Sequence, residues 1–266
     1  MLHSMFRSQP TRTAHAAIVV VLTLAVTAGC GDDAATSTDA TTTTTAVPVI
    51  DPGDGGDYAP ELDPARFVDV IDNPYLPLAV GSRWVYEGEA DEPGQSEHIE
   101  VVVLPERMEI LGISATVVRD TVTIDGVLVE DTHDWFAQDT EGNVWYLGEY
   151  AENYEDGELV DTEGSWEAGV DGAFPGIVML AHPAVGDAYR QEFYEGEAED
   201  LGEVLSIGGQ REVPAGPYTD VLVTRDWNPL EPEVVEEKTY APGVGMIHEE
   251  HVAGGSGTVA LISFTP

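Results

Sequence analysis

The chain has 266 residues, a length that allows one or two domains, and its 50 acidic and 10 basic side chains give a formal net charge of −40. A surface this negative repels nucleic-acid phosphates and anionic lipid headgroups, which argues against nucleic-acid binding and against a domain lying flat on a membrane. Cys30 is the only cysteine, so a disulfide within the chain is excluded, and cysteine-based zinc, iron–sulfur or thiol chemistry is disfavoured.

Residues 1–29 are predicted to form a lipoprotein signal peptide. Arg7 and Arg12 precede an uncharged run over residues 16–28. As a helix this run reaches about 20 Å, short of the ~30 Å hydrocarbon core, so it indicates a cleaved signal and not a membrane span. It ends in LAVTAGC, which resembles the lipobox of bacterial lipoproteins. The resemblance implies that Cys30 carries an acyl group such as palmitate and anchors the protein outside the cell membrane. The alternative is an ordinary secretory signal.

Residues 30–59 are predicted to be an acidic tether that follows the lipid-anchor cysteine. They are rich in Thr, Asp, Gly and Pro and offer little to bury. Such a segment cannot offset its ordering entropy, so we expect it to be disordered. As a flexible coil it would average roughly 30 Å from end to end.

Residues 60–266 are predicted to form one mostly-β domain, because β-branched runs alternate with turn signals such as Asp125-Gly126 and Asp156-Gly157. The expected strands are Ser82–Glu89, Glu97–Leu104, Ile113–Ile124, Val127–Asp139, Val144–Glu149, Glu158–Asp161, Ala188–Tyr194, Ala198–Leu205, Thr219–Asp226, Val234–Tyr240, Met246–Val252 and Thr258–Phe264. Residues 166–187 break this rhythm and are predicted to be a long loop with buried anchors. The pattern favours a strongly curved antiparallel sheet or a partly closed barrel, with a β-sandwich as the alternative.

Two motifs resemble metal sites but are explained by simpler structure. In His248-Glu249-Glu250-His251 the spacing is too short for a metalloprotease helix, and in a strand the two histidines would point to opposite faces. The run from Asp139 to Asn143 begins like a calcium loop, but position 12 of that loop is Tyr150, so we predict a hairpin turn. Serine-nucleophile elbows, P-loops and dinucleotide fingerprints are missing from the sequence.

The candidate ligand-binding or metal-binding residues are charged side chains that stand near aromatic residues in several predicted strands and turns. They are Asp134, Glu167, Asp171, Glu192, Glu197, Asp200 and Lys238, the last being the only lysine. If the sheet curls, these side chains could converge, and clustered carboxylates would raise one another's pKa. The alternative is that a chain this acidic brings some carboxylates together without any function.

Several sequence segments resemble those of an uncharacterised family of secreted bacterial lipoproteins. They are NPYLPLAVGSRWVYEG (73–88), EDTHDWFAQDTEGNVWYLGE (130–149), GSWEAGVDGAFPGIVM (164–179), YRQEFYEGEAED (189–200) and KTYAPGVGMIHEE (238–250). The order PLxxGSxWxY, VPAGPYxxV and YAPGVGMI is also similar to a wider set of antiparallel-sheet envelope proteins. Neither resemblance implies a known reaction.

We therefore expect an extracytoplasmic, lipid-anchored module without enzymatic activity. It would bind a small apolar or amphipathic ligand, or a partner protein of the envelope. One alternative is a domain that binds a divalent cation such as calcium; no other cofactor is expected. The other alternative is a carboxylate-based hydrolase of carbohydrate type, which needs two acids about 5–10 Å apart in an open cleft.

Overall fold

The computed structural model describes residues 58–266; the predicted signal peptide, Cys30 and the tether up to residue 57 lie outside this range. Tyr58, which was expected in the tether, is buried, and its hydroxyl donates to the Pro175 carbonyl at 2.7 Å. Tyr58 is therefore in contact with the folded domain. Within residues 58–266, no helix is long and apolar enough to cross a membrane.

Nearly all regular structure in residues 58–266 is β, apart from one 3-10 turn, η1 (Pro64–Arg66). The strands are β1 (Phe67–Val68), β2 (Asp72–Asn73), β3 (Leu76–Pro77), β4 (Arg83–Glu89), β5 (Ser96–Ile110), β6 (Ile113–Ile124), β7 (Val127–Asp139), β8 (Val144–Glu155), β9 (Glu158–Asp161), β10 (Trp166–Glu167), β11 (Phe174–Met179), β12 (Ala188–Arg190), β13 (Glu192–Phe193), β14 (Leu201–Val213), β15 (Gly216–Trp227), β16 (Val235–Ala241), β17 (Gly245–Ala253) and β18 (Thr258–Thr265).

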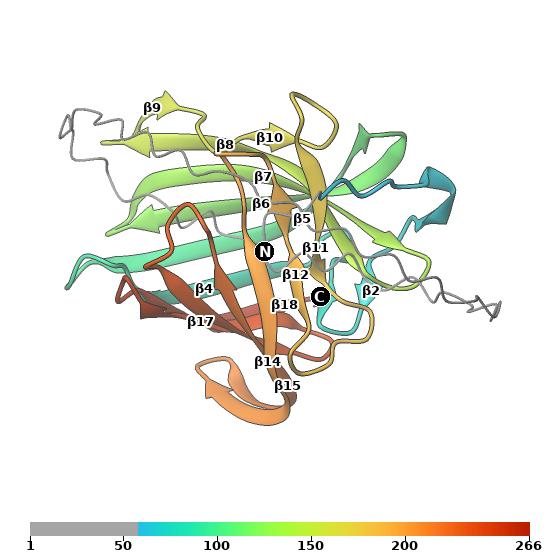
Figure 1. Cartoon of the computed structure of the whole chain (residues 1–266). Coiled ribbons are helices and arrows are strands. Elements are labelled where there is room, and N and C mark those ends of the chain that lie inside the picture. Colours follow the sequence, from blue (N-terminus) through green and yellow to red (C-terminus); the bar gives the residue numbers. More distant parts are fainter. Residues whose placement is uncertain (1–57) are drawn as a thin grey trace, which may run out of the picture. The chain divides into compact units, whose positions relative to one another are not determined.

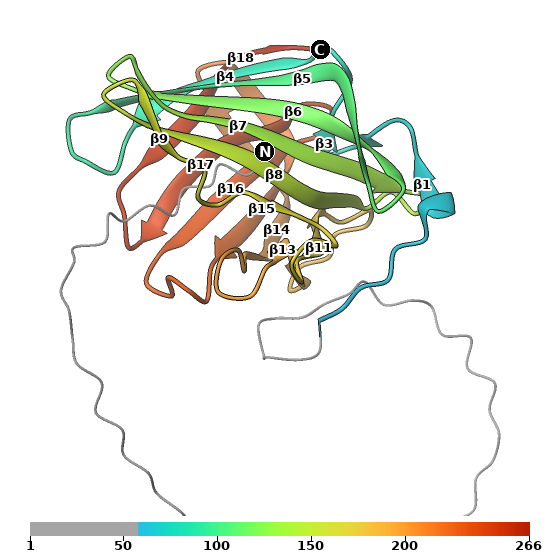
Figure 2. The same ribbon diagram turned by 90° about the horizontal axis from the view of Figure 1, so that it is seen from above.

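The long strands form one antiparallel sheet that curls on itself. Its order is β12-β14-β15-β16-β17-β18-β4-β5-β6-β7-β8-β11-β13. Figure 1 shows the strands side by side around the curve, and in Figure 2 the green strands β5 to β8 lie over the orange and red strands β14 to β17. Gln191 alone separates β12, which pairs with β14, from β13, which pairs with β11, so one chain segment links both ends of the sheet. The predicted partly closed barrel is confirmed, and the sandwich alternative is wrong.

The predicted long loop at 166–187 is wrong in part, because it contains β10 and β11. In β11, Ile177 lies opposite Trp145 of β8, and Phe174 lies opposite Phe193 of β13. Gly176 permits this crossing, since a Cβ at that position would lie 2.2 Å from the carbonyl carbon of Gln191. The glycine that breaks the strand pattern in the sequence is thus the residue that lets the sheet close.

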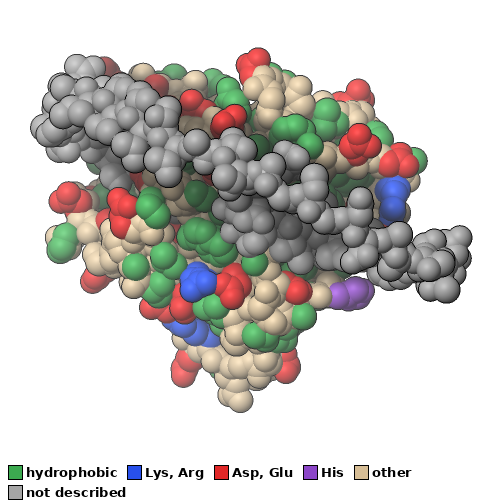
Figure 3. Space-filling view, in the orientation of Figure 1, with side chains coloured by type: hydrophobic (Ala, Val, Ile, Leu, Met, Phe, Trp, Pro, Cys, Tyr) green, Lys and Arg blue, Asp and Glu red, His purple; other side chains and the backbone are tan. Residues whose placement is uncertain are grey.

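The interior of the barrel changes character from one end to the other. Near the β5–β6 and β7–β8 turns, buried side chains such as Val103 and Phe136 are apolar, and residues of the segment before β4, such as Leu76, are buried as well. Towards the β4–β5 and β6–β7 turns, alternate buried positions carry acids, among them Asp120 and Glu149. On the outer face seen in Figure 3, acidic side chains are scattered among polar and hydrophobic ones.

Candidate functional site

Four of the seven predicted site residues come together inside the sheet. The side chains of Asp134 (β7), Glu192 (β13) and Lys238 (β16) are buried. Asp200, just before β14, shares a hydrogen bond with Glu192 and interacts electrostatically with Lys238. Glu192 is also within electrostatic reach of Asp134. Strands far apart in the sequence thus deliver these groups to one region.

The other three predicted residues lie elsewhere. In the β8–β10 pairing Trp166 is opposite Glu149 and Glu167 is opposite Gly148, so Glu167 lies on the face away from Glu149. Asp171 is exposed in the turn before β11, with φ 51°. Glu197 is exposed in the tight turn between β13 and β14. A hydrolase cleft that combines Glu167, Glu192 and Glu197 therefore has no support in this geometry.

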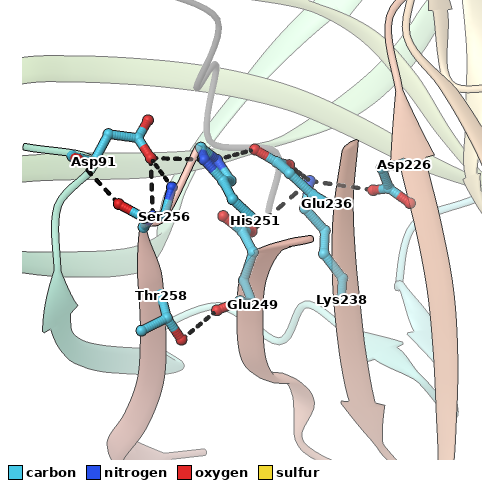
Figure 4. Close-up of polar contacts among 9 residues, drawn as sticks. Asp91, Asp226, Glu236, Lys238, Glu249, His251, Ser256 and Thr258 are labelled. Carbon is cyan, nitrogen blue, oxygen red and sulfur yellow. Dashed lines mark hydrogen bonds and ion pairs between the residues drawn. The ribbon is translucent and has the colours of Figure 1, made fainter. Parts of the chain in front are cut away.

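Lys238 lies at the centre of a set that we name the lysine cluster: Asp226, Glu236, Lys238, Glu249 and His251. Its Nζ is 3.1 Å from Asp226 Oδ2, 3.3 Å from Glu236 Oε2 and 3.8 Å from Glu249 Oε2. Strand register explains the contacts, because Lys238 lies opposite Glu249, and Glu236 lies opposite both Asp226 and His251. Figure 4 shows these side chains converging from β15, β16 and β17.

Burial and pairing set different protonation states within the lysine cluster. Burial raises the pKa of Glu249 to about 8, although Lys238 opposes the shift. Burial acts in the same direction on Glu236, but Lys238 and a hydrogen bond from His251 outweigh it and bring that pKa to about 2. The hydrogen bond with Glu236 raises the pKa of His251 to about 9 against the effect of burial. At neutral pH Glu236 is therefore a carboxylate between two cations, while Glu249 is mostly protonated.

His251 also connects the lysine cluster to the β4–β5 and β17–β18 turns. Its Nδ1 lies 2.8 Å from Asp91 Oδ1, in the β4–β5 turn. The same Asp91 oxygen accepts hydrogen bonds from the backbone N–H groups of Ser256 and Gly257 in the β17–β18 turn, at 2.9 and 2.8 Å (Figure 4). One carboxylate therefore ties two turns to the interior.

A second group, which we name the carboxylate cluster, consists of Asp120, Asp134, Glu149 and Glu192. Asp134 and Glu149 are directly opposite each other on β7 and β8. Tyr146 donates to Asp134 Oδ1 at 2.6 Å, and the Trp166 indole N–H donates to Glu192 Oε2 at 2.9 Å. Three buried oxygens, Asp120 Oδ1, Asp134 Oδ2 and Glu149 Oε2, accept no hydrogen bond from the described residues.

Burial and mutual repulsion keep protons on the carboxylate cluster. Burial raises the pKa of Asp134 to about 6, against the hydrogen bond from Tyr146. Burial, together with neighbouring carboxylates, raises the pKa of Asp120, Glu149 and Glu192 well above the ordinary range. Burial likewise raises the pKa of Asp200 to about 7, so the hydrogen-bonded Glu192–Asp200 pair holds a shared proton at neutral pH.

Aromatic rings surround one side of the carboxylate cluster. Phe136 and Tyr146 are stacked, with centroids 4.9 Å apart, and Trp166 meets Tyr146 edge-on at 5.3 Å. The cluster thus combines buried carboxyl groups with π-systems, a combination suited to a cation that replaces the protons of those groups.

The two metal-like motifs have the structures predicted for them. His248 lies opposite Thr239 and contacts Arg211, whereas His251 lies opposite Glu236, so the two rings are on opposite faces of β17. Asp139 Oδ1 accepts the backbone N–H groups of residues 141, 142 and 143, which makes its motif a hairpin turn. In the described part of the chain, no group of three or more His, Cys, Asp or Glu side chains is placed to hold a metal ion. A calcium site therefore stays an untested prediction.

Comparisons with known proteins give a likeness of fold at most. No protein-family model and no curated protein matches the sequence. A solved structure from Bacteroides fragilis, described as a "putative exported protein with YmcC-like fold", is 13% identical with a TM-score of 0.44, over 72% of this chain and 99% of that chain. Another, a "putative lipoprotein" from Parabacteroides distasonis, is 12% identical with a TM-score of 0.40, over 73% of this chain and 99% of that one.

Proposed function

We propose that the chain is a lipid-anchored binding protein of the cell envelope, held outside the membrane through Cys30, whose ligand site is the carboxylate cluster. The observation that carries the proposal is the set of three buried carboxylate oxygens without a hydrogen-bond donor among the described residues. Each such group costs about 1–3 kcal/mol of folding free energy. Groups of this kind are retained where function requires them.

The acidic interior changes the expected ligand. Sequence reasoning favoured an apolar or amphipathic molecule, but Asp134 and Glu149 are 0% and 5% exposed and face each other in the interior. A ligand that displaces water there must offer positive charge or hydrogen-bond donors. A binding role is also better supported than hydrolysis, since Glu192 and Asp200 bond directly to each other and leave no room for substrate between them.

The anchor predicts the distribution of the protein in the cell. With Cys30 intact, the full chain is expected in the membrane fraction and labelled by radioactive palmitate. Cys30→Ser should remove both properties and release the chain into the extracytoplasmic soluble fraction, because a tether rich in Thr and Asp has no affinity for lipid of its own. Membrane retention of the unlabelled variant would contradict the anchor.

The ligand site predicts a bound small molecule that depends on the carboxylate cluster. The full chain, purified in detergent and incubated with a protein-free bacterial extract, should carry a non-covalent adduct in native mass spectra. The double variant Asp134→Asn/Glu149→Gln should lose this adduct, since both substitutions keep shape but remove carboxyl groups that can ionise when a cation binds. Identical spectra for the two proteins, or spectra without any adduct, would contradict a ligand site in the cluster.

A further inference from the structure

Two acidic side chains face each other inside the sheet, and no Lys, Arg or His side chain of residues 58–266 forms an ion pair with either. Residues directly opposite on antiparallel strands have Cβ atoms about 5 Å apart, and like charges in that position are destabilising. Asp134 and Glu149 are such a pair, and Asp120, on the neighbouring strand β6, adds a third carboxylate within electrostatic reach of Asp134. An oxygen of each of the three is buried and accepts no hydrogen bond from the described residues. A cation between them would relieve all three.

Several cationic side chains of the described residues are engaged elsewhere. Lys238 is within 3.3 Å of both Asp226 and Glu236. Arg119 forms a bidentate pair with Asp131. The guanidinium of Arg190 lies over the ring of Phe193, with its central carbon 4.4 Å from the ring centroid. These three positive charges are thus committed to other partners.

The aromatic rings beside the carboxylate cluster indicate which kind of cation would bind there. The Tyr146 hydroxyl is used by Asp134 and the Trp166 indole N–H by Glu192, so both rings are fixed beside the carboxylates. Ring faces attract ammonium groups, and carboxylate oxygens accept their N–H bonds. A bare metal ion gains less here, because no three carboxylates among residues 58–266 converge as metal ligands. An ammonium group can instead direct its N–H bonds to separate oxygens.

We propose that Asp120, Asp134 and Glu149, beside the rings of Tyr146 and Trp166, bind the ammonium group of a small organic amine. This inference rests on the proposed binding function and assigns its ligand class. Three N–H groups of a primary ammonium match the three unpartnered oxygens in number. The rings of Tyr146 and Trp166 then contact the hydrocarbon part of the amine.

Calorimetric titration of the full chain in detergent, at 150 mM NaCl, tests the proposal with 1,4-diaminobutane as the probe. Saturable binding is expected, with a rise in melting temperature that grows with probe concentration. The neutral isostere 1,4-butanediol should give neither signal. Calcium chloride should shift the melting temperature no more than sodium chloride at the same ionic strength. Saturable calcium binding in place of amine binding, or an equal response to the diol, would overturn the proposal.

A charge-matched pair of variants separates the site from the general acidity of the chain. Glu149→Gln removes one ionisable carboxyl group from the cluster, and Glu158→Gln removes one from the exposed β9. Glu149→Gln should weaken amine binding about tenfold or more, because it removes a charge-assisted hydrogen bond. The variant should fold, since an amide replaces a buried carboxyl group whose pKa burial already raises well above its ordinary value. Glu158→Gln should change the affinity less than twofold. Equal effects of the two substitutions would mean that surface charge attracts the amine, and would refute the site.

The native mass spectra distinguish failure of this inference from failure of the proposed function. If the amine does not bind but an extract adduct is still lost in Asp134→Asn/Glu149→Gln, the ligand class is wrong and the binding function stands. If both signals are missing, both proposals fail.

Discussion

Replacing Lys238 with methionine is expected to lower the free energy of unfolding by about 3–5 kcal/mol, because removing one partner of a buried ion pair leaves uncompensated charge. Burial lowers the pKa of Lys238, but Asp226, Glu236 and Glu249 together raise it well above its ordinary value, so the side chain is cationic at every accessible pH. Methionine keeps the volume and removes the charge. Urea denaturation at pH 7, followed by tryptophan fluorescence, measures the change.

The matched control lies on the neighbouring strand. Arg225 of β15 pairs with Glu203, but its side chain is 45% exposed, whereas that of Lys238 is 3% exposed. Arg225→Met should therefore cost less than about 1 kcal/mol. Adding Asp226→Asn should restore part of the stability to Lys238→Met and almost none to Arg225→Met. If Lys238→Met were no more destabilising than Arg225→Met, the lysine cluster would not support the fold as described.

The barrel could be predicted from the sequence where local signals agree. Strands β6 and β7 have the expected bounds, since β-branched alternation surrounds an Asp125-Gly126 turn whose two residues adopt positive φ, 50° and 79°. Strand β14 was expected to end at Leu205 but continues to Val213. Its Gly208-Gly209 pair resembles a loop, but in the structure it forms a bulge within the pairing with β15, where Gly208 has φ 88°. Where a strand continues through a glycine bulge, local patterns are insufficient.

The candidate site could be predicted only in part. Lys238 is conspicuous as the only lysine, but most other members of the two clusters were missed: Asp120, Glu149, Asp226, Glu236, Glu249 and His251. In a chain with 50 acidic residues, a single acid within a strand carries little information. Asp120 could have been found, because it alternates with the buried Val118 and Val122. Glu149 could not, since a bulge between Asp134 and Phe136 changes which residues of β7 and β8 face each other.

The stability of the domain is expected to fall as pH rises from 5 to 9, with its maximum near pH 5. Native Asp200 and Glu249, with pKa values raised by burial to about 7 and about 8, hold protons that the unfolded chain releases near pH 4. Their contribution to stability is complete below pH 4 and is lost as pH rises through 7 and 8. His251, with its pKa raised to about 9 by Glu236, contributes fully below pH 6.5 and loses that contribution through pH 9. Glu236, with its pKa lowered to about 2 by Lys238 and His251, opposes this and loses its contribution as pH falls from 4.5 to 2. Asp91 and Glu100, whose pKa values are also lowered, act in the same direction as Glu236.

The slope of the unfolding free energy against pH is proportional to the number of protons that the folded protein holds and the unfolded chain does not. Each such proton contributes about 1.4 kcal/mol per pH unit. Urea denaturation at several pH values should therefore give a decline of at least that size between pH 5 and 7. The charged groups that face Glu249 are Lys238, Glu236, Asp226 and Glu97. Glu249→Gln should make the slope between pH 5 and 8 shallower by the amount that corresponds to at most one proton. Glu250→Gln, on the outer face of the same strand, should leave it unchanged.

Repulsion between surface charges would give a slope that 0.5 M NaCl abolishes, whereas buried groups are screened far less. A slope that is flat, or that disappears in salt, would mean that these carboxyl groups are not buried in the folded protein.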